Sequence, residues 1–182
     1  MNFRRFASLV FLGAIATLSS GCATSPARPV EADGTYCHRV GKTYRQTLTC
    51  TALPVPSAAV EADAKRFEAT PEAGMLYIVR RRWGDMANRV PVFVDDQPAV
   101  LTIPYSVVRV RLRPGNHQVV IEWEAKRHVT YVNARAGEVL FVEVEGSVWA
   151  WGSTYSWAEP DAEGARRRAL RSKLIADVNL GP

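Results

Sequence analysis

Residues 107–123 read VVRVRLRPGNHQVVIEW. The first six alternate, so that valine and leucine side chains fall on one face of a strand and Arg109 and Arg111 on the other. Residues 113–116 (RPGN) are a strong turn signal, because proline presets φ and glycine tolerates a positive φ. Residues 118–123 then put valine, isoleucine and tryptophan on one face. This pattern predicts two strands joined by a turn.

Similar runs lie on both sides of this stretch, separated by turn residues such as Asp95-Asp96. The strands predicted in this way cover residues 75–80, 90–94, 99–103, 107–112, 118–123, 128–134 and 139–145. About seven strands at roughly ten-residue spacing predict a mainly β chain, folded as an antiparallel β-sandwich.

A short helix is expected before the strands and another after them. Ser57 is a plausible N-cap for a helix over residues 58–69, where Val60, Ala64 and Phe67 form one apolar stripe. Near the C-terminus, residues 159–178 are predicted to be helical.

Asp161 is a possible cap for this second helix, and Leu170, Leu174 and Val178 share one of its faces. Much of the remaining surface is basic, through Arg166, Arg167, Arg168, Arg171 and Lys173. Such a face can lie against anionic lipid headgroups or can simply be solvated while the leucines dock on the sheet.

Residues 146–157 (GSVWAWGSTYSW) are rich in aromatic and small residues. Their candidate binding side chains are Trp149, Trp151, Tyr155 and Trp157. Flat aromatic faces stack on sugar rings or form hot spots for protein partners. The alternative is that these rings pack the end of the sandwich or the C-terminal helix, since large aromatic side chains are mostly buried.

The N-terminal residues have the pattern of an export signal. Arg4 and Arg5 form a short positive region, and residues 7–18 (ASLVFLGAIATL) are an apolar run shorter than a comfortable membrane span. Small residues 19–21 then lead to Cys22. This arrangement resembles the lipobox of bacterial lipoproteins, in which the cysteine thiol is alkylated with diacylglycerol and becomes the mature N-terminus.

The resemblance implies a membrane anchor on Cys22, held by several acyl chains. The lipobox has an aliphatic residue three positions before the cysteine, where this chain has Ser19 and carries Leu18 one position earlier. An ordinary secretory signal cut nearby and a signal anchor are the alternatives. Ala23 follows the cysteine in place of Asp, which by the same resemblance implies the outer membrane, facing the periplasm.

Length and net charge narrow the classes of protein to which the rest of the chain can belong. Of 182 residues, removal of residues 1–21 leaves 161, which is one domain's worth with a substantial core. The chain has 23 Lys and Arg against 18 Asp and Glu, and the two arginines of the signal reduce the mature net charge to +3. So small an excess gives no reason to propose nucleic-acid binding.

The two remaining cysteines, Cys37 and Cys50, predict a disulfide, because an exported protein folds in an oxidising compartment. A metal site that uses Cys37, His38 and Cys50 is the alternative, but adjacent Cys and His are a poor chelate and a fourth ligand is not evident. We expect no metal and no other cofactor.

The predicted organisation has five parts. Residues 1–21 are a signal peptide, residues 22–35 a flexible tether, and residues 36–53 a disulfide-closed loop or hairpin. Residues 54–145 form a helix with the β-sandwich, and residues 146–182 form an aromatic segment with the C-terminal helix.

The order and spacing of several short motifs between residues 58 and 144 resemble a family of small bacterial lipoproteins defined only as a domain of unknown function, with affinity to PEGA-like domains. The motifs are a helix ending in Phe67, Gly74 with residues 77–80 (YIVR), residues 93–96 (FVDD), residues 113–117 (RPGNH) and residues 136–138 (AGE). The resemblance implies an envelope lipoprotein with an immunoglobulin-like or prealbumin-like sandwich, and it brings no catalytic residues.

The three histidines His38, His117 and His128 are scattered, and we find no nucleophile-elbow, zincin or phosphate-loop motif. We therefore expect a non-catalytic, lipid-anchored envelope protein that binds a protein partner or stabilises an envelope assembly. A peptidoglycan- or carbohydrate-binding module that uses the tryptophans is the first alternative, and an enzyme with an unrecognised site is the second.

Overall fold

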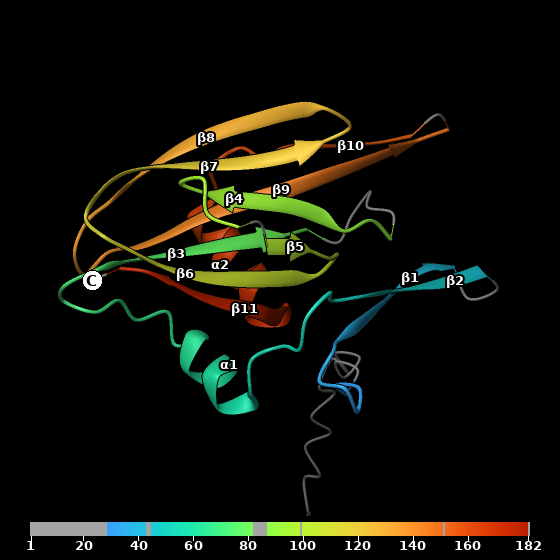
Figure 1. Ribbon diagram of the computed structural model, residues 1–182, viewed down its shortest axis with the longest axis horizontal. Coiled ribbons are helices and arrows are strands. Elements are labelled where there is room, and N and C mark those ends of the chain that lie inside the picture. Colours follow the sequence, from blue (N-terminus) through green and yellow to red (C-terminus); the bar gives the residue numbers. More distant parts are fainter. Residues whose placement is uncertain (1–28, 43–44, 82–86, 99, 151, 182) are drawn as a thin grey trace, which may run out of the picture.

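The computed structural model of the protein describes residues 29–42, 45–81, 87–98, 100–150 and 152–181 (Figure 1). Within these ranges the chain forms eleven strands and two helices. The strands are β1 (Cys37–Lys42), β2 (Arg45–Cys50), β3 (Gly74–Arg80), β4 (Val90–Val94), β5 (Val100–Thr102), β6 (Ser106–Leu112), β7 (Gly115–Trp123), β8 (Lys126–Ala134), β9 (Val139–Trp149), β10 (Gly152–Trp157) and β11 (Lys173–Leu180). The helices are α1 (Ala58–Ala64) and α2 (Ala162–Arg171).

The strands form three sheets. One has five strands in the order β10-β9-β3-β6-β11, one has four in the order β5-β4-β7-β8, and β1 and β2 form a separate hairpin. The hairpin extends from one end of the molecule (Figure 1). Two pairs in the five-stranded sheet are parallel, β3 with β9 and β6 with β11, and the other pairs are antiparallel.

The mainly β class predicted from the sequence is confirmed, and each of the seven predicted strands is present, as β3 to β9. The count of about seven and the purely antiparallel arrangement are wrong. The hairpin β1–β2 and strands β10 and β11 raise the number, and the two parallel pairs make the five-stranded sheet mixed. Parallel neighbours come from distant parts of the chain, so local alternation does not reveal them.

The predicted C-terminal helix is correct only in its first half. The carboxylate of Asp161 accepts a hydrogen bond from the Gly164 N–H, as expected of a cap, but α2 ends at Arg171 and Lys173 begins β11. An apolar residue at every fourth position fits a strand as well as a helix, so periodicity alone did not separate the two. β11 pairs with β6 at the edge of the five-stranded sheet, and its residues Leu174 and Ile175 are buried.

Helix α1 begins as predicted and ends early. The Ser57 hydroxyl accepts a hydrogen bond from the Val60 N–H, and the helix closes at Ala64, before the predicted end at residue 69. Phe67 then adopts a positive φ of 54°, which turns the chain out of the helix. The ring of Phe67 packs edge-on against Tyr77 and Phe141 of the five-stranded sheet.

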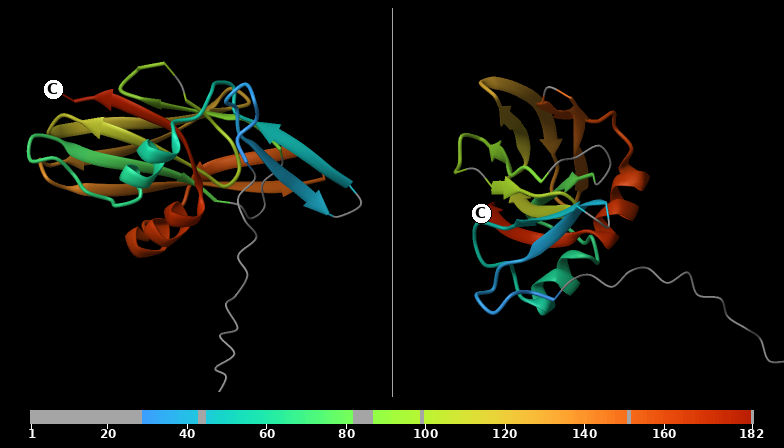
Figure 2. Two further views of the ribbon diagram at one scale, coloured as in Figure 1. Left: turned by 90° about the horizontal axis from the view of Figure 1, so that it is seen from below. Right: turned by 90° about the vertical axis from the view of Figure 1, so that its right-hand side faces the viewer.

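The two large sheets face each other across the main core. Its largest fully buried aliphatic side chains include Leu76, Leu112 and Ile121, one or more from each sheet. A second apolar cluster lies on the outer face of the five-stranded sheet, where Ala64 of α1 and Ala169 of α2 pack with Tyr77. Figure 2 shows the two helices from two further directions. Both helices therefore cover the same sheet, which decides where a free surface remains.

Candidate functional site

Three of the candidate site residues predicted from the sequence lie wholly or partly outside the described part of the chain, and so does the predicted signal peptide, residues 1–21. Cys22 and Trp151 are outside the described residues. Trp149 is the last residue of β9, but its side chain is outside the description as well. The lipid anchor and the two tryptophans at the β9–β10 turn therefore stay predictions.

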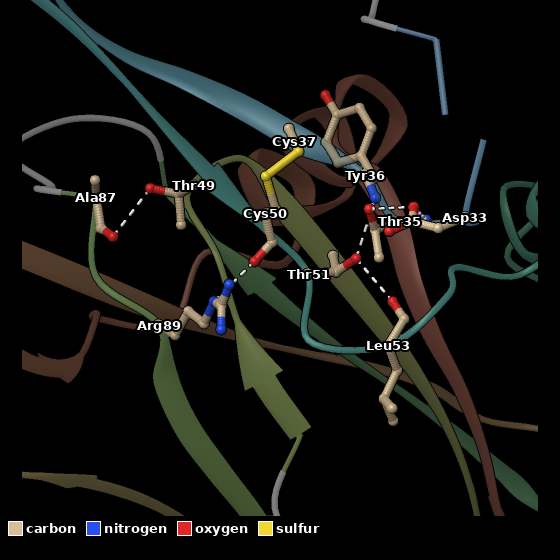
Figure 3. The surroundings of a disulfide bond; sticks show 10 residues. All are labelled: Asp33, Thr35, Tyr36, Cys37, Thr49, Cys50, Thr51, Leu53, Ala87 and Arg89. Atoms are coloured by element: carbon tan, nitrogen blue, oxygen red, sulfur yellow. Dashed lines mark hydrogen bonds between the residues drawn. A yellow bond between two sulfur atoms is a disulfide. The ribbon is translucent and has the colours of Figure 1, made fainter. Parts of the chain in front are cut away.

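The predicted disulfide is present. Cys37 and Cys50 are directly opposite each other in the β1–β2 register, and the disulfide joins the two ends of the hairpin (Figure 3). Both sulfur atoms are used in this bond, so the alternative metal site with His38 is wrong. The hairpin is held against the body by two hydrogen bonds, from the Thr49 hydroxyl to the Ala87 carbonyl and from Arg89 Nε to the Cys50 carbonyl.

The two described aromatic residues of the predicted binding set are packing residues. Tyr155 is only 2% exposed and its hydroxyl accepts a hydrogen bond from Asn88 Nδ2 at 2.9 Å. Trp157 is half-buried against the core, and its indole N–H donates to the His128 carbonyl at 2.9 Å. The hollow beside Trp157 has a volume of about 60 Å³, well below the roughly 300 Å³ of small-molecule sites.

His117 is the histidine with the most developed surroundings. It is buried, its Nδ1 lies against the Asp95 carboxylate, and its Nε2 lies 2.7 Å from the Arg113 carbonyl oxygen. The other oxygen of Asp95 accepts a hydrogen bond from the Gln118 N–H. Both ring nitrogens are thus occupied in tying two turns together, an arrangement that stabilises the fold.

Among the residues that the structure describes, no group of three or more His, Cys, Asp or Glu side chains is placed to hold a metal ion. None of the helices in the described ranges is long and apolar enough to cross a membrane.

Arg109, Asp63 and Asp177 on the helix-covered face are paired with one another. Arg109 of β6 donates from Nε and Nη2 to the two carboxylate oxygens of Asp177, at 2.8 and 2.7 Å, and from Nη1 to Asp63 at 2.6 Å. The hydrogen bonds to Asp177 raise the pKa of Arg109 further above its ordinary value. Tyr77 donates to the Ala64 carbonyl, and burial raises its pKa to about 12. These contacts link β6 to the neighbouring strand β11 and fix α1 against the five-stranded sheet.

The outer face of the four-stranded sheet is different, because both helices pack on the other sheet. Val92, Val119 and Ile121 point into the core, so the residues that alternate with them point outward. We call this outward surface the open face. Its apolar members are Phe93, Leu101, Val120, Val129 and Tyr131.

The strand register makes the open face contiguous. Phe93 is opposite Val120, and Val120 is opposite Val129, which gives an apolar row across three strands. Next to this row Tyr131 is 72% exposed, and its hydroxyl accepts a hydrogen bond from Gln118 Nε2. Val129 is 41% exposed. Val120, in the middle of the row, is only 2% exposed, so the accessible apolar surface consists of Val129 and Tyr131 beside the half-buried Phe93. Exposed apolar side chains grouped on an uncovered sheet are typical of a site where another molecule binds.

A hollow of about 470 Å³ adjoins the open face at the β7–β8 turn. It is lined by Pro91 of β4 and by residues 122–127. Trp123 packs against the core on one side and lines the hollow on the other. We call this site the end hollow.

Sequence reasoning missed both surfaces. Alternation placed Val119, Ile121 and Trp123 on one face of a strand, but it did not show which sheet the helices would cover. Val129 and Tyr131 alternate with core residues of β8 in the same way, and this was the available signal. Trp123 was placed on the same strand face as Val119 and Ile121, and its position at a strand end carries no mark of the adjoining hollow.

No protein-family model matches the chain, and no curated protein resembles it in sequence.

Proposed function

We propose that the protein is a non-catalytic, lipid-anchored binding module of the bacterial envelope that docks a protein partner on its open face. In this proposal the two facing sheets form an immunoglobulin-like or prealbumin-like sandwich of the PEGA-like lipoprotein type. The diacylglycerol on Cys22 anchors the module to the outer membrane on the periplasmic side, and residues 22–35 act as the tether.

The observation that carries the proposal is the asymmetry of the two sheets. Helices α1 and α2 cover the outer face of one sheet, whereas the other sheet leaves Val129 and Tyr131 exposed beside the half-buried Phe93. Protein interfaces have an apolar, aromatic-containing centre with few charges and a polar rim. Tyr131 fits the centre of such an interface, because tyrosine combines large contact area with a hydroxyl that hydrogen-bonds.

The paired polar groups support a binding role over a catalytic one. His117 uses both ring nitrogens on partners within the fold, and Arg109 uses its guanidinium on Asp63 and Asp177. Catalysis requires groups that are oriented yet free to act on a substrate.

Site-specific photocrosslinking in cells tests the proposal. A benzoylphenylalanine at position 131 is expected to give one discrete crosslinked product, and Val129→Glu in the same protein is expected to abolish it. The same probe at position 167 is the control, because Arg167 is an exposed residue of α2, the helix that packs on the five-stranded sheet. Equal crosslinking from positions 131 and 167, or no product from position 131, contradicts the proposal.

The anchor is tested separately by palmitate labelling. The wild-type protein is expected to incorporate the label and Cys22→Ser to lose it, because the thiol is the acylated group. Equal labelling of the two proteins rules out Cys22 as the site of lipidation.

A further inference from the structure

We infer that the end hollow binds a pyranose ring of a neutral glycan, which stacks against Trp123. This site goes beyond the proposed protein-docking function and does not depend on it. Its volume of about 470 Å³ falls within the roughly 300–1,000 Å³ of small-molecule sites.

The aromatic platform of the site is held rigidly. The indole N–H of Trp123 donates to the Ser153 carbonyl at 2.8 Å, and the ring packs edge-on against Tyr155 with centroids 4.8 Å apart. Tyr155 is itself held by Asn88, as described above. Because the indole N–H is already used, Trp123 offers a ligand only its apolar aromatic surface. An orientation fixed before binding lowers the entropic cost of binding.

The rim of the hollow selects the charge of the ligand. It carries two carboxylates, Glu122 and Glu124, and two cations, Lys126 and Arg127, of which Glu122 and Arg127 form an ion pair at 3.0 Å. The carboxylates disfavour an anionic ligand and the cations disfavour a cationic one. Four ionisable side chains around the hollow equally disfavour a wholly apolar ligand, since their desolvation is costly.

A neutral polyhydroxylated ring satisfies these conditions together. Its hydroxyls donate to the carboxylates of Glu122 and Glu124 and accept from Lys126 and Arg127. Its C–H face contacts the indole of Trp123, and Pro91 supplies a second apolar wall. The sequence offered Trp149, Trp151, Tyr155 and Trp157 as a glycan site, and the inference uses a different tryptophan, Trp123, in their place.

The backbone of the β7–β8 turn holds the rim. Glu124 and Ala125 both have positive φ, 47° and 61°, in a two-residue turn closed by the Trp123–Lys126 pair. This turn type favours Asn and Gly, so Glu and Ala are accommodated at some cost in backbone strain. It keeps the rim residues Glu124 and Lys126 directly beside the aromatic platform.

Binding of soluble neutral tetrasaccharides to the purified full chain tests the inference. The probes are chitotetraose, with N-acetylated rings, and cellotetraose, with unmodified ones, each titrated to millimolar concentration by calorimetry. We expect at least one of them to bind, and sedimentation with purified peptidoglycan then shows whether an envelope glycan presents the same rings. Absence of binding by both tetrasaccharides overturns the inference.

Variants locate the site. Trp123→Leu is expected to weaken binding by about tenfold or more, because the stacking surface is lost. Trp157→Leu is the matched control, since Trp157 is also a half-buried indole that donates to a backbone carbonyl but lies outside the hollow, and it is expected to bind as the wild type does. Unchanged binding by a folded Trp123→Leu protein overturns the inference.

A surface variant covers the case in which Trp123→Leu does not fold. Replacing Glu124 and Lys126 together with alanine removes half of the rim and leaves the platform, and it is expected to weaken binding several-fold. Unchanged binding by this double variant overturns the inference. Val129→Glu, on the open face, is expected to retain glycan binding and to lose the protein crosslink from position 131, so that the two proposals fail independently.

Discussion

The guanidinium of Arg168 forms a bidentate pair with the carboxylate of Glu143, from Nε to Oε1 and from Nη2 to Oε2, each at 2.5 Å. Glu143 is 4% exposed and lies on β9, whereas Arg168 lies on α2. A second guanidinium, that of Arg81, donates to the same carboxylate at 2.9 Å. This pairing fixes the second helix on the five-stranded sheet and so helps to leave the other sheet uncovered.

Arg168→Ala is expected to destabilise the protein by about 2 kcal/mol, because it takes one of two cationic partners from a buried carboxylate. Urea denaturation measures the effect. Arg167→Ala is the control, and it is expected to change stability by less than about 0.5 kcal/mol, since Arg167 is exposed and only distantly paired with Glu163. Equal effects of the two substitutions show that the pair with Glu143 contributes nothing to stability.

Glu61 is expected to make stability depend on pH in the acidic range. Burial acts to raise the pKa of its carboxyl group, but hydrogen bonds from Lys173 and Lys65 outweigh burial and lower the pKa below the ordinary value of 4.5. The folded state therefore holds the proton less tightly than the unfolded state does. The stabilisation by Glu61 is present above the ordinary value and is lost as the pH falls through the lower, folded value.

Urea denaturation of wild type and Glu61→Gln at several pH values checks this expectation. The difference in unfolding free energy between them should be largest near neutral pH and should shrink once the pH drops below about 4.5. Glu163→Gln is the matched control, because the Glu163 side chain is 91% exposed. A wild-type advantage over Glu61→Gln that stays constant down to acidic pH contradicts the assigned role of Lys173 and Lys65.

Reduction of the disulfide is expected to open the β1–β2 hairpin and to leave the two large sheets folded. An isolated two-stranded hairpin is marginal in water, and a disulfide that closes a loop of this size contributes about 3 kcal/mol. Hydrogen exchange of a Cys37→Ser, Cys50→Ser variant measures the change. Faster exchange is expected for the amides of β1 and β2 and unchanged exchange for the β7–β8 hairpin. Uniformly faster exchange in both hairpins would show that the disulfide stabilises the whole fold.

A pair of valines tests the orientation of the four-stranded sheet, on which both proposed sites depend. Val119→Thr is expected to cost about 1–3 kcal/mol, because it places a hydroxyl in the core where Val119 is fully buried. Val129→Thr, on the opposite strand and the open face, is expected to change stability by less than about 0.5 kcal/mol. Thermal unfolding of the two variants gives the comparison, and a larger loss for Val129→Thr would reverse the assignment of the faces.

Features set by neighbouring residues agreed with the sequence-based expectations. Asp95 and Asp96 both adopt positive φ, 47° and 59°, as expected of short Asx side chains in a tight turn. Ser57 and Asp161 cap their helices, and Cys37 pairs with Cys50. Each of these depends on residues that are close in the chain or on a pairing with only one choice.

Features that depend on contacts between distant segments differed from the sequence-based expectations. Strand β11 was expected to be helical, because its apolar spacing suits either period, and its parallel pairing with β6 decided the outcome. Tyr155 was a candidate for a binding surface with packing as the alternative, and it lies in the core, because the five-stranded sheet places β10 beside β9 with the Tyr155 side chain facing the other sheet. Composition did not mark Trp123 as different from the other tryptophans.

The sequence by itself determined the mainly β class, the positions of β3 to β9, the helix starts at Ser57 and Asp161, and the disulfide, since alternation, capping and turn chemistry are local. Only the tertiary structure decided that α1 and α2 cover one sheet, that Tyr131 lies on an open face and that Trp123 lines a hollow. The physical reason is that a strand's pattern shows two faces but not what packs against each, and that choice depends on contacts between segments far apart in the chain.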